Sequence, residues 1–195
     1  MDRTARVERK TSETAITLDL RVDGTGRGNI ATKIPFFDHM LTLFARHSLV
    51  DLDVKADGDI EVDLHHTVED TGIALGQAFA KALGEKRGIR RYGLAYVPMD
   101  ETLARAVVDF SGRPFLAYRA PENVHCSGPF SLQLVEEFLR AFSVHAACNV
   151  HVELLYGRDV HHLAEAVFKS LAKAVDQACQ LDARVQGVPS TKGTL

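Results

Sequence analysis

The chain has 195 residues, of which 46% are hydrophobic and 25% charged, as in an ordinary globular protein. Its 23 basic and 26 acidic side chains give a formal net charge of −3, which excludes a general electrostatic grip on nucleic acid. There is no apolar run of the ~20 residues that a membrane helix needs, no signal-peptide core and no CxxC pair among three cysteines. We therefore expect a cytoplasmic protein with neither nucleic acid nor membrane as a partner.

Alternating apolar residues and apolar residues at helical spacing predict the elements of the fold. In chain order these are strands at 14–22 and 28–34, a helix at 36–47, a strand at 50–56, a helix at 66–83, strands at 102–110 and 114–119, a helix at 131–146, a strand at 150–156 and a helix at 161–179. The glycine-rich stretch 24–28 lacks the context of a phosphate-binding loop and predicts a hairpin turn. The order strand–strand–helix–strand–helix occurs twice, which predicts an α+β fold with helices layered on a sheet.

Matching residues indicate that the chain contains the same unit twice. Glu13 and Glu101 open similar alternating runs 88 positions apart, and the pair at 65–66 recurs at 161–162. The segment 37–41 likewise matches 135–139. Because the landmarks recur in the same order, we predict a tandem duplication. We expect a first α+β repeat at 1–88, a second at 89–185 and a mobile C-terminal tail at 186–195, with the two repeats forming one compact domain.

Two His-His pairs stand at the starts of predicted helices and suggest metal ligands. Residues four apart share a helix face, so His65 and Glu69 converge, whereas His66 lies about 100° round the helix and points elsewhere. The second helix repeats this arrangement with His161, Glu165 and His162. One such pair alone is more often surface or capping chemistry, but two copies in register with a duplicated fold favour metal binding. The ExxH spacing at 122–125 lies between prolines and predicts a loop.

The two helices can supply each other with ligands. We predict one site from His65, Glu69 and His162, and a second from His161, Glu165 and His66. The repeat adds His39 and Glu137 as fourth ligands. Because these groups seldom meet within one small chain, we expect the sites to form between subunits. Imidazole and carboxylate donors suit Mn²⁺, Fe²⁺ or Zn²⁺, with Mn²⁺ first if several positions stay open to water.

Five segments together resemble the imidazoleglycerol-phosphate dehydratase family of histidine biosynthesis. They are FFDHML at 36–41, HHTVED at 65–70, PMDE at 98–101, HHLAEAVFK at 161–169 and PSTKG at 189–193. The resemblance covers essentially the whole chain. It implies a tandem-repeat α+β fold, a homo-oligomer of trimers assembled into a 24-mer, and two Mn²⁺ per subunit at subunit interfaces. The implied reaction is the dehydration of D-erythro-imidazole-glycerol phosphate to imidazole-acetol phosphate.

The resemblance also implies site residues. The implied metal ligands are His39, His65, His66, Glu69, Glu137, His161, His162 and Glu165. Some family members carry histidine where this chain has Glu137, although glutamate also binds Mn²⁺. The implied substrate-binding residues are Glu13, His39, His47, His65, Glu69, Arg91, Arg113, His161, Lys169, Ser190 and Lys192. Within this set the arginines, the lysines and Ser190 match the positions that grip phosphate.

Glu13 and His47 are the candidate catalytic residues. The hydrogen removed in the implied reaction is not next to a carbonyl and is scarcely acidic, so metal coordination of the substrate imidazole would let the ring relay electrons. We assign proton transfer to Glu13. Its repeat partner Glu101 stands beside Asp100. For Glu101 the alternative role is to orient the metal ligands instead of transferring a proton.

Two further functions stay open from the sequence. The same ligands would serve a binuclear hydrolase of phosphate esters, or a structural clasp of histidines that assembles a shell. The roles of His145 and His151 are undetermined by the pattern, although His151 lies inside a predicted strand.

Overall fold

The computed structural model describes residues 2–121 and 128–195, so the ExxH spacing at 122–125 lies outside the described residues. The first half contains β1 (Thr4–Lys10), β2 (Thr14–Arg21), β3 (Ile30–Ala31), α1 (Pro35–Ser48), β4 (Asp51–Gly58) and α2 (His65–Leu83). The second half contains β5 (Tyr92–Met99), β6 (Thr102–Asp109), β7 (Phe115–Arg119), α3 (Leu132–His145), β8 (Asn149–Tyr156) and α4 (Val160–Cys179). No helix among these residues is long and apolar enough to cross a membrane.

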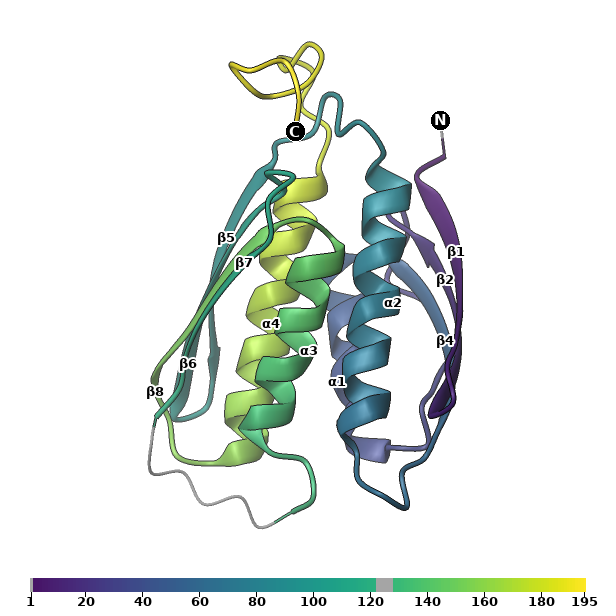
Figure 1. The fold of residues 1–195 in the computed structure, drawn as a ribbon. Coiled ribbons are helices and arrows are strands. Elements are labelled where there is room, and N and C mark those ends of the chain that lie inside the picture. The colour runs from purple at the N-terminus through teal and green to yellow at the C-terminus, as the bar shows by residue number, and fades with distance from the viewer. Residues whose placement is uncertain (1, 122–127) are drawn as a thin grey trace.

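Each half folds into a sheet covered by its own two helices, and the helices of the two halves pack together between the sheets (Figure 1). The strand order is β1-β2-β4-β3 in one sheet and β5-β6-β8-β7 in the other. In both, only the last pairing, β3 with β4 or β7 with β8, is parallel among the described strands. The predicted α+β class is confirmed, and the repeated strand order is consistent with a duplicated unit.

The first strand of each half has no counterpart among the elements predicted from the sequence. β1 buries only Val7 below a charged outer face, and β5 exposes large apolar residues where alternation would place polar ones. Both are edge strands, paired on one side only, so their residues are not selected for a clear two-faced pattern. The hairpin predicted at 24–28 was wrong, because β2 pairs with β1 and β4 and not with β3. The loop instead folds over Asp51, whose carboxylate accepts backbone N–H groups.

The core lies where helices meet helices and sheets. Phe37 of α1 packs edge-on against Phe138 of α3, which in turn contacts Phe168 of α4. α2 approaches α3 closely at two glycines, where a Cβ on Gly72 or Gly76 would lie within 2.8 Å of a backbone oxygen of α3. This packing holds the helices in a fixed relation.

All four described helices begin at one end of the molecule and run the same way (Figure 1). Every predicted metal ligand lies in the first two turns of a helix, and so at this end. The C-terminal tail lies at the opposite end, against the loops before β5 and β7. The fold therefore separates the predicted ligands from the predicted phosphate-binding tail.

Candidate functional site

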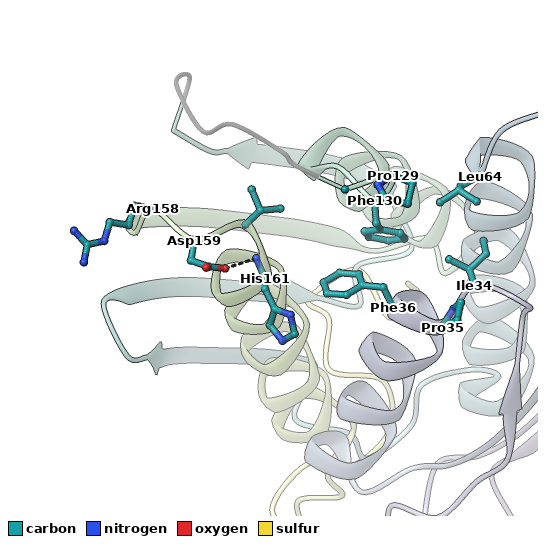
Figure 2. A pocket seen from close by; sticks show the side chains of 11 residues that line it. Ile34, Pro35, Phe36, Leu64, Pro129, Phe130, Arg158, Asp159 and His161 are labelled. Atoms are coloured by element: carbon teal, nitrogen blue, oxygen red, sulfur yellow. Dashed lines mark hydrogen bonds between the residues drawn. The ribbon is translucent and has the colours of Figure 1, made fainter.

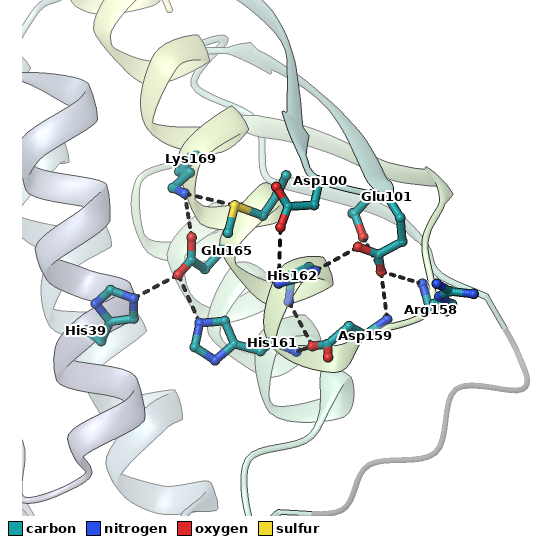
Figure 3. Close-up of polar contacts among 11 residues, drawn as sticks. His39, Asp100, Glu101, Arg158, Asp159, His161, His162, Glu165 and Lys169 are labelled. Atoms are coloured by element: carbon teal, nitrogen blue, oxygen red, sulfur yellow. Dashed lines mark hydrogen bonds and ion pairs between the residues drawn. The ribbon is translucent and has the colours of Figure 1, made fainter.

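Three predicted ligands form a compact group between α1 and α4. Oε1 of Glu165 lies 2.9 Å from Nε2 of His39 and 3.0 Å from Nε2 of His161 (Figure 3). One ligand atom from each of the three residues lies within 4.8 Å of the other two. The Glu165 side chain is 7% exposed, whereas the two imidazoles are 44% and 51% exposed. The group is therefore anchored on a buried carboxylate and opens toward solvent on its imidazole side.

Local sequence explains how these atoms meet. His161 and Glu165 are one helical turn apart, and Asp159 caps α4 by accepting the backbone N–H of His161 at 2.8 Å. α1 starts with Pro35, a favourable first helical residue, and packs beside α4 so that His39 faces Glu165. The equivalent aspartate in the first half is Asp63, which accepts the backbone N–H of His65 at 2.7 Å, although the N-cap position of α2 is Leu64. These two aspartates were not predicted, although their repeated spacing before each His-His pair was a usable signal.

Glu165 is ionised at neutral pH. Burial raises the pKa of its carboxyl group, but the hydrogen bonds from Lys169, His39 and His161 outweigh burial and lower that pKa to about 2. Lys169, one turn further along α4, also reaches Sδ of Met99 at 3.5 Å. The group thus offers two imidazole nitrogens and one anionic oxygen, a donor set that fits Mn²⁺, Fe²⁺ or Zn²⁺.

The corresponding residues of the first half are more open. Nε2 of His65 lies 3.8 Å from Oε2 of Glu69, and both side chains are 43% exposed. Glu137 lines the same cavity as His65, but its carboxylate lies 3.8 Å from Nε of Arg140. In the part of the chain that is described, these residues do not form a compact three-ligand group. Glu137 as a ligand stays a prediction.

His66 and His162 point away from the neighbouring pairs, as the helix geometry predicts. Nδ1 of His66 lies 3.0 Å from Asp59. Nδ1 of His162 lies 2.7 Å from Glu101, as Figure 3 shows. Each hydrogen bond raises the pKa of its imidazole. The compact group of one chain includes neither histidine. That the two helices supply each other with ligands therefore stays a prediction, and it concerns contacts between different chains.

Four carboxylates face these two histidines in different ways. Glu101 accepts hydrogen bonds from the backbone N–H of Asp159 and from His162, which lower its pKa to about 2. Glu13 and Asp100 instead face Nε2 of the two histidines, each at 3.8 Å. Asp59, at the end of β4, was missed by the sequence analysis because it belongs to no periodic pattern and has no matching carboxylate in the repeat.

The predicted residue His47 is half-buried two turns beyond His39 on α1. Burial, followed by the nearby ammonium groups of Lys169 and Lys173, lowers the pKa of its imidazole. Burial and Arg9 likewise lower the pKa of His145 on α3. Both rings are therefore neutral at neutral pH.

Most predicted phosphate-binding residues lie at the other end of the molecule. Arg91 forms a two-pronged ion pair with Asp109 at 2.7 and 3.1 Å and donates to the backbone oxygen of Pro189 at 2.9 Å. Its backbone N–H bonds Ala178 near the end of α4, about 26 Å along the helix axis from His161. The exposed Arg113 and Lys192 and the half-buried Ser190 lie at the same end. Within one chain, Lys169 alone of this set lies on the side of the metal-ligand group.

A cavity of about 470 Å³ adjoins His161 (Figure 2). Its wall is largely apolar, and the ring of Phe36 packs edge-on to His161 with centroids 5.2 Å apart. Arg158 and Asp159 line its polar side. No sequence pattern predicts this cavity, because its walls come from four separated segments.

Comparison with known proteins places the chain in a family. A family model described as imidazoleglycerol-phosphate dehydratase matches residues 32–175. The chain is 57% identical over 195 residues to the imidazoleglycerol-phosphate dehydratase of Geobacter sulfurreducens and 54% identical to that of Acetivibrio thermocellus, with full coverage on both sides.

Solved structures agree. The imidazoleglycerol-phosphate dehydratase of Staphylococcus aureus superposes with a TM-score of 0.82 at 38% identity, covering 92% of this chain and 99% of that one. The Pyrococcus furiosus structure superposes with a TM-score of 0.84 at 33% identity, covering 97% and 100%. The chain therefore belongs to the imidazoleglycerol-phosphate dehydratase family, the dehydratases of histidine biosynthesis.

Proposed function

We propose that this dehydratase depends on Mn²⁺, bound at two sites per chain, and converts D-erythro-imidazole-glycerol phosphate to imidazole-acetol phosphate. The observation that carries the metal dependence is the group of His39, His161 and Glu165, whose donor atoms already lie within 4.8 Å of one another. The equivalent His65, Glu69 and Glu137 would form the second site. When bound, the metal ion supplies a Lewis acid for the substrate's imidazole ring.

Glu13 is the residue that we assign to proton transfer. Its side chain is 48% exposed, and its carboxylate accepts no hydrogen bond from the described residues, although it lies 3.8 Å from Nε2 of His66. A carboxylate without other hydrogen bonds can come within hydrogen-bond reach of the proton that it transfers. We assign His47 to the same site as a neutral imidazole, because burial and two lysines suppress its protonation.

Lys169 holds the substrate's phosphate from the metal side. Its side chain is 17% exposed and its ammonium group is paired with Glu165, so it lies beside the candidate donor group. The other phosphate-binding residues would bind the same phosphate from a neighbouring chain, since in their own chain they lie at the far end of α4. They are Arg91, Arg113, Ser190 and Lys192.

We further propose that the outer face of the second sheet is where copies of this chain associate. This face exposes Tyr92, Leu94, Tyr96, Phe115, Leu155 and Tyr156, each to between 42% and 58%. The first sheet has the same topology but carries Arg6 and Glu8 at the positions of Leu94 and Tyr96. The fold itself thus does not require an apolar outer face. Contiguous exposed apolar residues mark an interaction surface, and a second copy would supply the site residues that one chain lacks.

We propose that this association gives trimers and a 24-mer, in the cytoplasm. Free buried thiols at Cys148 and Cys179 suit that reducing compartment.

A Mn²⁺ titration of metal-stripped protein tests the function, with dehydration and light scattering followed together. We expect activity to rise until about two Mn²⁺ are bound per chain. Assembly on metal addition without dehydration would instead support the structural clasp. Release of inorganic phosphate from the substrate would support the hydrolase.

A further inference from the structure

His66 and His162, which point away from the neighbouring ligand pairs, are each held at one ring nitrogen by a carboxylate. Nδ1 of His162 lies 2.7 Å from Oε2 of Glu101, and Nδ1 of His66 lies 3.0 and 3.2 Å from the two oxygens of Asp59. Among the described residues, their Nε2 atoms have no contact this short: the carboxylates that face them are 3.8 Å away. The two rings are thus restrained at Nδ1 and open at Nε2.

This restraint selects a tautomer. An ionised carboxylate only accepts hydrogen bonds, so the ring nitrogen that faces it carries the proton. In a neutral imidazole the other nitrogen then presents its lone pair. Carboxylates placed in this way beside metal-binding histidines fix the orientation of the ring and raise its basicity. The arrangement presents Nε2 of His66 and of His162 as outward donor atoms.

The two halves reach this result with different residues. Glu101 occupies the repeat position of Glu13, yet only Glu101 bonds a histidine Nδ1. Its other oxygen accepts the backbone N–H groups of Arg158 at 3.2 Å and Asp159 at 3.0 Å, which ties it to the start of α4 (Figure 3). In the first half it is Asp59 that bonds the imidazole of His66. The carboxylate of Glu13 has no hydrogen bond among the described residues.

We propose that Glu101 is a positioning residue that holds His162 with Nε2 directed outward as a metal donor, and that Asp59 does the same for His66. The two glutamates at equivalent repeat positions therefore have different roles. Glu101 orients the metal ligand His162, while Glu13 remains available to the substrate. This inference rests on the proposed metal-dependent function.

The first test exchanges Glu101→Gln and measures Mn²⁺ binding to metal-stripped protein from the electron paramagnetic resonance signal of free Mn²⁺. Glutamine keeps an oxygen for the two backbone N–H groups but presents an amide N–H to Nδ1. His162 then carries its proton on Nε2 and loses its donor atom. We expect one of the two sites per chain to weaken about 10–100-fold while the other keeps its wild-type affinity.

Two further variants keep the test decisive. Asp59→Asn changes a carboxylate that bonds only His66 among the described residues, so it perturbs no backbone contact, and we expect the same loss at the other site. Asp100→Asn removes the same charge beside His162 without changing the contact at Nδ1. Asparagine tolerates the positive φ of 47° at position 100, so the backbone is not strained. We expect Asp100→Asn to leave both affinities unchanged.

The outcomes separate the inference from the function. If Glu101→Gln and Asp100→Asn weaken Mn²⁺ binding equally, the loss of a negative charge explains the effect. The positioning role of Glu101 would then be overturned. Wild-type affinity at both sites in Glu101→Gln and in Asp59→Asn would overturn the inference while leaving the metal-dependent function intact. A wild-type protein that binds no Mn²⁺ would overturn both.

Discussion

The spacing of α2 and α3 makes Gly76→Ala an informative change. Replacing an exposed helical glycine by alanine stabilises a protein by about 1 kcal/mol, because alanine is the better helix former. At Gly76, however, the added Cβ would lie 2.7 Å from the backbone oxygen of Phe142 and 2.8 Å from the backbone nitrogen of Ala146. Backbone atoms cannot rotate away as a flexible side chain can, so α2 must move from α3.

The magnitude follows from two opposing effects. Overpacking a tight contact costs about 1–3 kcal/mol, and contact with two backbone atoms places Gly76 at the upper end of that range. After the gain of about 1 kcal/mol in helix propensity, we expect a net loss of about 1–2 kcal/mol in the free energy of unfolding. The displacement would also separate His65 on α2 from Glu137 on α3, and so weaken Mn²⁺ binding.

Urea unfolding of metal-stripped protein at one fixed protein concentration measures the loss, because assembly would otherwise shift the midpoint. Gln77→Ala, the adjacent and half-exposed position of α2, is the matched control and should change stability by no more than about 0.5 kcal/mol. A Gly76→Ala protein that is more stable than wild type by about 1 kcal/mol would refute the close helix contact.

Three other changes test the site and the core. Glu165→Gln removes the anionic donor and should lower Mn²⁺ affinity at that site at least about 100-fold, whereas retained affinity would contradict the assignment. Lys169→Met should raise the KM for the phosphorylated substrate about tenfold or more, with the exposed Lys81→Met on α2 as a control; equal KM values would count against Lys169. In a Cys126→Ser variant both remaining thiols are buried, and burial raises the pKa of Cys148 to about 12. A disulfide reagent at pH 8 should therefore modify neither thiol until the protein unfolds, and rapid reaction of the native protein would disprove this.

Local patterns were enough to predict the helices and the duplication. Each predicted helix is confirmed to within two residues at either end, since apolar spacing of 3.6 residues is set by neighbours along the chain. The edge strands β1 and β5 were missed because only pairing with β2 and β6 makes them strands. Likewise the loop at 24–28 depends on contacts with Asp51, which no local pattern indicates.

The sequence by itself determined which donor atoms share a helix turn. His161 and Glu165 had to converge, because four residues make about one turn, and His162 had to point elsewhere. Only the tertiary structure decided that α1 brings His39 to the same carboxylate, that Asp59 restrains His66, and that Arg91 lies at the far end of α4. These contacts join residues far apart in the chain, and their geometry depends on how helices and sheets pack rather than on spacing along any one of them.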